Sequence, residues 1–342
     1  MRVELLNEPA RLQEAPGNDD LLIRPALRSD LEDFFDLAAL AGPGFTSMPM
    51  DEALLADRLI KSERAFAGEP GSLILGLEDQ ASRRVLGCAA IKPGGQPRPD
   101  FLNFLLSHDR RTVSLTKRYQ DLTEVGSLLL HPDLRRNGIG RWLAQSRYLL
   151  ISMDTSRFGH RVFSELRGVV GPDGRSPFYD SVCARHFDLS FADADQHCAL
   201  GRQGDLNARM PTGPVPIQGL TGEARNAIGR PHRDGEPALR YLLDEGFRFE
   251  GVVDLLDGGP AVVANCLDVK TIRCSFAASI IEGEIGPGEG QPAYIATGTG
   301  IEFRCRRASL VKRRKTFICN QEVLLSLDLK PGSKARVYIP VD

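Results

Sequence analysis

The sequence predicts an α+β fold in which helices flank a mixed, mostly antiparallel sheet. Three observations carry this prediction. An apolar run at 125–130 ends in a glycine-containing turn and leads into an amphipathic pattern that begins at Ile139. Ahead of it, residues 21–91 show runs typical of strand, helix, helix, strand and strand, in that order. Beyond residue 257, short β-rich runs separated by Gly and Pro indicate a small additional β module.

Bulk composition narrows the function classes. The chain has 342 residues, 42% of them hydrophobic and 26% charged, and a net charge of −2, so no charge excess indicates nucleic acid or a membrane surface. Neither a signal-peptide core nor a membrane-spanning apolar run is present. The 7 cysteines are an odd number and include no C-x-x-C pair, which favours free thiols over disulfides or a zinc site. We therefore expect a cytoplasmic globular protein that holds no metal.

The first elements follow from local signals. A short strand is expected at 21–24, after a flexible extension at 1–20. Ser29 and Glu32 form a capping box for a helix that runs to about Ala41, and a second helix is expected from Asp51. Two strands follow at 72–78 and 85–91, and 92–100 is rich in Pro and Gly and indicates a loop.

The second half contains weaker signals. A strand is expected at 162–166, a short helix with Ser176 as its N-cap, and a helix from Glu236 that stops at Gly246. Segments 178–187 and 240–247 look alike, which suggests a second, partial copy of one folding unit, although coincidence explains so short a likeness equally well. The C-terminal module is expected to contain strands at 275–281, 293–297, 316–319, 323–327 and 336–339.

The turn after the apolar run is the strongest functional signal. It consists of Arg135, Arg136, Asn137, Gly138, Ile139 and Gly140, the pattern Arg-x-x-Gly-x-Gly. A helix start presents unpaired N–H groups and a positive dipole end, and glycine lets a phosphate approach the backbone closely. The pattern differs from both the dinucleotide fingerprint and the P-loop. It resembles the coenzyme A pyrophosphate loop of GNAT-superfamily acyltransferases, and the alternative is an ordinary strand–turn–helix corner.

An ordered set of segments resembles one family within that superfamily, the arginine N-succinyltransferases. Each piece is short, but together they follow the family's order and spacing across roughly 22–275. The pieces are 45–49 (FTSMP), 128–140 (LLLHPDLRRNGIG), 146–148 (SRY), 165–169 (ELRGV), 176–178 (SPF), 227–232 (AIGRPH), 245–248 (EGFR) and 254–260 (DLLDGGP). The stretch 188–222 matches poorly.

The resemblance implies a division of the chain and an activity. Residues 21–190 would form a GNAT-like acyl-CoA-binding domain, 191–270 a second GNAT-like, acceptor-side region, and 271–342 the small β module. The implied reaction transfers succinyl directly from succinyl-CoA, a co-substrate rather than a permanently bound cofactor, to the α-amino group of L-arginine. An acceptor such as ornithine is an alternative, and so is a non-catalytic CoA-binding paralogous subunit. The protein is expected to be a homo-oligomer or to pair with a paralogous subunit.

The family match also implies roles for particular residues. His232 matches the family's proton-donating histidine, and Leu128 matches a succinyl-CoA contact. Backbone N–H groups of Leu128, Leu129 and Leu130 would meet the thioester oxygen, as on the corresponding strand of GNAT folds. Tyr179 lies where many GNAT enzymes carry a tyrosine that protonates the thiolate, although we favour a packing role for it. Glu124 could relay the proton of the amine or could be only a charge at the end of the strand, and we weigh the two alternatives equally.

Recognition of arginine calls for carboxylates, because a guanidinium pairs with them bidentately. Glu165, Asp254 and Asp257 are the candidates. Thr46 and Ser47 lie in the loop that covers the acceptor site in GNAT folds, so their hydroxyls are candidate substrate contacts. Arg167 is a candidate partner of the succinyl carboxylate.

Overall fold

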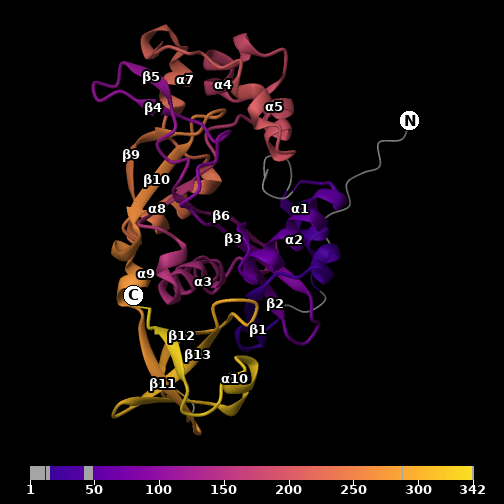
Figure 1. The fold of residues 1–342 in the computed structure, drawn as a ribbon, viewed down its shortest axis with the longest axis vertical. Coiled ribbons are helices and arrows are strands. Elements are labelled where there is room, and N and C mark those ends of the chain that lie inside the picture. The colour runs from indigo at the N-terminus through magenta and orange to yellow at the C-terminus, as the bar shows by residue number, and fades with distance from the viewer. Residues whose placement is uncertain (1–11, 13–15, 42–48, 287, 341–342) are drawn as a thin grey trace.

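The computed structural model describes residue 12 and residues 16–41, 49–286 and 288–340 (Figure 1). Most of the expected extension at 1–20, and both Thr46 and Ser47, lie outside the described residues. The strands are β1 Leu21–Pro25, β2 Leu73–Asp79, β3 Val85–Lys92, β4 Asn103–Leu106, β5 Thr112–Thr116, β6 Thr123–Leu130, β7 Arg161–Glu165, β8 Val215–Pro216, β9 Arg248–Val253, β10 Pro260–Asn265, β11 Phe276–Glu282, β12 Gln291–Thr297, β13 Arg304–Arg313, β14 Thr316–Cys319 and β15 Lys334–Tyr338. The α-helices are α1 Leu31–Ala41, α2 Glu52–Phe66, α3 Ile139–Met153, α4 Pro177–Val182, α5 Phe191–Ala199, α6 Gln203–Asn207, α7 Gly222–Ala227, α8 Glu236–Asp244, α9 Lys270–Cys274 and α10 Gln321–Ser326.

Within the described residues, all strands belong to one sheet. Its order is β12-β15-β11-β14-β13-β1-β2-β3-β6-β7-β10-β9-β4-β5-β8. Only the β6–β7 and β11–β14 pairings are parallel. The α+β class with a mixed, mostly antiparallel sheet is therefore confirmed. In Figure 1 the C-terminal strands occupy one end of the long axis, and the β4–β5 hairpin with α4, α5 and α7 occupies the other.

Helices cover both faces of the central strands because successive side chains of a strand point to opposite sides. On one face, Leu129 packs with apolar residues of α1 and α2. On the other face, Leu130 packs in the largest core cluster with Trp142 and Leu143 of α3. The near-continuous apolar run of β6 thus reflects burial on both sides, as expected from the sequence.

The sheet continues across the division expected at residue 190. β9 and β10 pair with each other, and β10 pairs with β7, so α8 and these strands extend the sheet that β1 begins. The sequence likeness between 178–187 and 240–247 does not extend to the structure, because α4 is followed by a short 3₁₀ turn and α5, whereas α8 is followed by β9. The C-terminal module joins the same sheet where Ile23 of β1 faces Cys305 of β13.

Two local predictions are wrong for identifiable reasons. Of the strand expected at 323–327, residues 323–326 belong to α10 and Leu327 is its C-cap, because periodicity cannot distinguish helix from strand for so short an apolar run. Ser29 does not cap α1. A 3₁₀ turn at Arg28–Asp30 precedes the helix, and Asp30 accepts the backbone N–H of Leu27 at 2.8 Å. By contrast, Asp51 and Ser176 cap their helices as expected.

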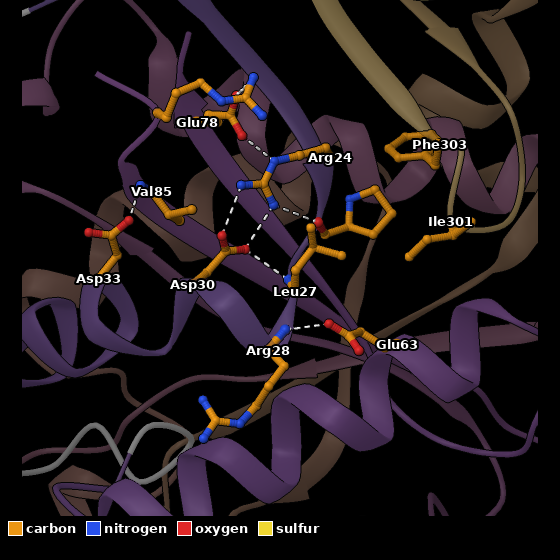
Figure 2. A network of polar contacts seen from close by, with 12 residues as sticks. Arg24, Leu27, Arg28, Asp30, Asp33, Glu63, Glu78, Val85, Ile301 and Phe303 are labelled. Carbon is orange, nitrogen blue, oxygen red and sulfur yellow. Dashed lines mark hydrogen bonds and ion pairs between the residues drawn. The ribbon is translucent and has the colours of Figure 1, made fainter. Parts of the chain in front are cut away.

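A buried polar network fixes the first strand against its neighbours (Figure 2). Arg24 of β1 donates to both carboxylate oxygens of Asp30, at 2.8 and 3.0 Å, and to the carboxylate of Glu78 on β2. All three side chains are buried. The network therefore joins β1, β2 and the turn that precedes α1 through one guanidinium.

Candidate functional site

An irregularity in β6 exposes backbone at the centre of the sheet. Cys88 of β3 faces Leu129 and Ala90 faces Gly126, so Ser127 and Leu128 together oppose a single residue of β3. Ser127 has a φ of 51°, a conformation that an L residue adopts only when its surroundings impose it. This is a β-bulge, which interrupts the hydrogen-bond ladder and redirects local backbone groups.

On its other side, β6 is paired with β7 only at its beginning. Thr123 faces Val162 and Glu124 faces Phe163, and no further β6–β7 pair occurs in the described part of the chain. β7 continues to Glu165 against β10. The two parallel strands therefore separate beside the bulge, and we refer to 125–130 with 164–167 as the β6–β7 divergence.

The turn between β6 and α3 is open to solvent. Asn137 and Gly138 both have positive φ, 52° and 70°, and Gly138 is the N-cap of α3. Arg135 to Gly138 are exposed, and a Cβ built on Gly138 would meet no atom within 4 Å. Within the described residues, the N–H groups of Asn137, Gly138, Gly140 and Arg141 have no acceptor. This geometry suits a phosphate.

The C-terminal module packs along α3 and reaches this turn. Arg307 of β13 donates to the carbonyl oxygen of Asn137 at 2.8 Å. Tyr294 of β12 lies 6.3 Å from Trp142 between ring centroids, and Arg336 of β15 donates to Ser152 at 2.9 Å. The module thus contacts α3 at both ends of the helix.

Glu165 lies at the end of β7 with an unusual environment. It accepts a hydrogen bond from Asn103 at 2.6 Å and forms no ion pair with any described residue. Burial, followed by the charges of Asp254 and Glu124, raises the pKa of Glu165 well above the ordinary glutamate value, against the opposing effect of the Asn103 hydrogen bond. The raised pKa means that Glu165 keeps its proton to a higher pH than an ordinary glutamate, and a cation bound beside it would favour the ionised form.

Glu124, on the neighbouring strand β6, has a lowered pKa, in contrast to Glu165. Burial alone would raise its pKa, but the ion pairs with Lys92 at 2.8 Å and Arg98 at 2.5 Å outweigh burial and lower it. Glu124 therefore stays ionised and is already paired, which favours a structural charge over a proton relay.

Asp254 and Asp257 adjoin Glu165 in the turn between β9 and β10. Asp254 accepts the N–H groups of Leu256 and Asp257, each at 2.8 Å, so part of its function is to shape the turn. Burial and then the charge of Asp254 raise the pKa of Asp257 well above the ordinary value. We call Glu165, Asp254 and Asp257 the acidic cluster.

His232 is held against the end of β7. Its backbone N–H donates to the carbonyl of Arg167 at 2.7 Å, and the preceding Pro231 forms a bridge with Gly168. A Cβ on Gly168 would lie 2.4 Å from the carbonyl oxygen of Asp257, so only glycine permits this close packing. His232 and the acidic cluster therefore border the same strand end.

The imidazole orientation defines which nitrogen is available. Nδ1 of His232 accepts the N–H of Asp234 at 3.3 Å, so the neutral ring carries its proton on Nε2. The side chain is 30% exposed, which leaves it accessible to a ligand.

Arg167 and Tyr179, the candidates for binding the succinyl carboxylate and for protonating the thiolate, already have structural partners. Arg167 forms a bidentate pair with Asp195, at 2.7 and 2.8 Å, lies 3.4 Å from Asp257 and covers the Phe191 ring. Its charge is thus already matched by protein carboxylates. The hydroxyl of Tyr179 donates to the carbonyl of Leu189 at 3.1 Å, and burial raises its pKa to about 12, so packing is its principal role.

Sequence reasoning missed the residues that complete the acidic region. Asn103 belongs to the β4–β5 hairpin, which the sequence analysis did not predict, and Lys92 and Arg98 lie in or next to a segment that we expected to be a loop. Nothing in their local sequence signals contact with β7. Arg147 was a detectable signal, because it is a charged residue within the apolar stripe of α3.

The fold and this site together define a GNAT-type acyltransferase, an enzyme that takes its acyl group from an acyl-CoA. A family model described as arginine N-succinyltransferase beta subunit matches residues 21–271. The chain belongs to the arginine N-succinyltransferase family.

Individual relatives agree along nearly the whole chain. The arginine N-succinyltransferase of Citrobacter koseri is 32% identical over 333 residues, which cover 93% of this chain and 97% of the relative. That of Enterobacter is 31% identical over 326 residues, covering 90% and 93%. The solved structure of arginine/ornithine succinyltransferase subunit AI from Pseudomonas aeruginosa superimposes with a TM-score of 0.82 at 25% identity, covering 94% of this chain and 99% of that one. No helix in the described part of our protein is long and apolar enough to cross a bilayer.

Proposed function

We propose that this protein transfers the succinyl group of succinyl-CoA to the α-amino group of L-arginine. The observation that carries the proposal is Glu165, a carboxylate with a raised pKa and no ion-pair partner among the described residues, beside His232 and the β6–β7 divergence. A cationic amino acid supplies the missing charge. The names of the family and of its relatives agree with this acceptor.

In this proposal the donor lies between the helix turn and the bulge. The diphosphate of succinyl-CoA binds Arg135, Arg136, Asn137, Gly138, Ile139 and Gly140, where free N–H groups and the α3 dipole meet it. The thioester lies at Leu128, Leu129 and Leu130, and the backbone N–H groups of this segment that point away from β3 stabilise the negative charge that develops on its oxygen.

The chemistry then needs one nucleophile and one acid. The neutral α-amine attacks the thioester carbon, a C–N bond forms, the C–S bond breaks, and the amine loses a proton to solvent or a nearby base. Nε2–H of His232 protonates the departing thiolate, because Nδ1 is occupied as an acceptor. Glu165, Asp254 and Asp257 bind the guanidinium, and Thr46 and Ser47 belong to the acceptor side.

The reaction itself is tested by thiol release. Purified protein with succinyl-CoA should release free CoA thiol at a rate that depends on L-arginine and should form N-succinylarginine, detectable by mass spectrometry. Binding of CoA without turnover on any amine would contradict the proposal and favour a non-catalytic subunit. Because the Pseudomonas relative's name includes ornithine, the same assay with ornithine ranks the two acceptors.

Acceptor affinity should depend on pH through Glu165. Because its pKa is raised, Glu165 gains a proton at a pH above the ordinary glutamate range, and it loses its attraction for a cation below that point. The KM for arginine should therefore rise as pH falls through this window, while affinity for CoA stays constant. Initial rates at several pH values measure both.

Glu165→Gln should raise the KM for arginine about 10- to 100-fold, the equivalent of a lost charge-assisted hydrogen bond, and remove its pH dependence. The variant should be at least as stable as wild type, because a raised carboxyl pKa means that the ionised form opposes folding as pH rises. Glu250→Gln is the matched control, since Glu250 is paired with Arg118 and Arg161. An equal KM change in both variants would contradict the assignment.

Arg307→Ala should weaken CoA binding about three- to tenfold, because Arg307 holds the Asn137 carbonyl and adds positive charge beside the diphosphate site. Calorimetry with CoA measures this without an acceptor. Lys312→Ala, on the same strand but without an ion pair in the described structure, should bind CoA as wild type does. Equal affinities for all three proteins would show that Arg307 contributes nothing to donor binding.

We also propose that the protein acts in the cytoplasm, as a homo-oligomer or with a paralogous subunit. None of the 7 cysteines forms a disulfide in the described structure and one, Cys274, is exposed, which suits a reducing compartment. The family model's description as a beta subunit supports assembly. Light scattering of the protein alone and after mixing with a paralogue distinguishes the two assemblies.

A further inference from the structure

Arg147 is a buried cation with an incomplete set of partners. It lies on α3 and is 3% exposed. Its Nε donates to the carbonyl of Ala144 at 3.1 Å, and Nη1 donates to the carbonyl of Gly126 at 3.1 Å. Nη2 donates to no atom of the described residues, and it is not among the fully enclosed polar atoms.

The other two buried arginines of the described residues each form an ion pair with a carboxylate. Arg24 pairs with Asp30 and Glu78, and Arg306 pairs with Glu322. Arg147 forms no ion pair with any described carboxylate. An uncompensated buried charge is costly, so such a residue is retained at an expense in stability unless a ligand supplies the opposite charge.

The Arg147 guanidinium lies close to the proposed position of the acyl group. Gly126 immediately precedes the bulge, at the point where β6 leaves β7. The nearby Cys88 thiol contacts the carbonyl of Ser127 at 3.3 Å, and its pKa is raised to about 12 by burial, with the Arg147 charge acting in the opposite direction. The guanidinium therefore lies under the bulge that carries Leu128.

We propose that Arg147 binds the terminal carboxylate of the acyl group and selects a dicarboxylic acyl-CoA as donor. Succinyl places this carboxylate two methylene groups beyond the thioester carbonyl, so it remains within the β6–β7 divergence when the carbonyl lies at Leu128. The free Nη2 and the shared Nη1 can both donate to it, in the geometry in which guanidinium recognises carboxylates. This inference rests on the proposed function and names its donor specificity.

Arg167 does not fit the role of binding the terminal carboxylate of the acyl group. Arg167 already satisfies two carboxylates, Asp195 bidentately and Asp257, and a succinyl carboxylate there would compete with both. It would also lie among the negative charges of the acidic cluster. Arg147 meets neither objection.

The test compares two donors that differ only at the chain end. Butyryl-CoA has a methyl group where succinyl-CoA has its terminal carboxylate. Arg147→Gln should lower kcat/KM for succinyl-CoA about 100-fold, the loss of a charge-assisted pair, and change kcat/KM for butyryl-CoA less than about threefold. Arg147→Lys keeps the charge but lacks the two parallel N–H donors of the guanidinium, so its kcat/KM for succinyl-CoA should lie between those of wild type and Arg147→Gln.

Arg157→Gln is the matched control. Arg157 also donates to a backbone carbonyl, that of Ala65, but lies beyond the far end of α3. Affinity for free CoA and thermal unfolding check that the Arg147 variants are folded. Equal losses with both donors, or none with succinyl-CoA, would overturn the assignment.

Assays of the wild-type protein with both donors distinguish a failure of this inference from a failure of the proposed function. Wild type that acylates arginine equally well from either donor would overturn the carboxylate site while leaving acyl transfer intact. Wild type without turnover would contradict the function, and calorimetric binding of succinyl-CoA against butyryl-CoA would still decide the role of Arg147.

Discussion

Replacing His232 with alanine is expected to lower kcat about 10²- to 10⁴-fold, the range that general acid–base groups contribute. Affinity for CoA should stay within about twofold, because the proposed diphosphate site at 135–140 lies on another strand end. The physical reason is the tautomer: with Nδ1 accepting the Asp234 N–H, Nε2 carries the proton that the thiolate needs. Steady-state thiol release and calorimetry with CoA measure the two quantities.

Asp234→Asn provides the control for this prediction. The Asp234 carboxylate lies 3.5 Å from Nδ1 of His232 but is 78% exposed, so its charge is strongly screened. The backbone N–H that fixes the imidazole remains in this variant, and kcat should change less than about threefold. Unchanged kcat in His232→Ala would remove the histidine from the mechanism, and a parallel loss of CoA affinity would assign it to structure.

The part of the site that could be predicted from sequence is the part that local chemistry determines. The turn at 135–140 follows from glycine, an apolar strand and an amphipathic helix that are adjacent in the chain, and the structure forms it as expected. Asp51 and Ser176 cap helices because capping depends on neighbouring residues. The role of His232 came from the family resemblance, since a histidine in a Gly/Pro-rich loop carries no decisive signal of its own.

The rest depends on contacts between distant residues. Glu165 becomes a candidate ligand group because Asn103, Asp254 and Glu124 approach it from three separate strands or turns. Arg307 reaches Asn137 across 170 positions of sequence. A charge in the apolar stripe of α3 marks Arg147 in the sequence, but only the structure shows that its hydrogen bonds go to two backbone carbonyls and to no carboxylate. Such properties follow from sheet order, which no local pattern specifies.

Arg24→Met is expected to lower the free energy of unfolding by about 3–5 kcal/mol, the cost of leaving buried carboxylates without their partner. Asp30 would lose two hydrogen bonds, at 2.8 and 3.0 Å, and Glu78, which is 0% exposed, would keep only the exposed Arg83 at 2.7 Å. Methionine fills much of the volume, so the loss reports charge rather than a cavity. Urea unfolding followed by circular dichroism measures it.

Arg84→Met separates burial from pairing. Arg84 also contacts two carboxylates, Asp33 at 2.8 Å and Asp36 at 2.7 Å, but its side chain is 49% exposed. Water solvates the partners when it is removed, so this variant should lose no more than about 1 kcal/mol. Because Asp30 orders the turn before α1 and Glu78 lies on β2, unfolding of Arg24→Met should remain a single transition. Equal losses in the two variants would show that the buried network contributes no more to stability than the exposed one.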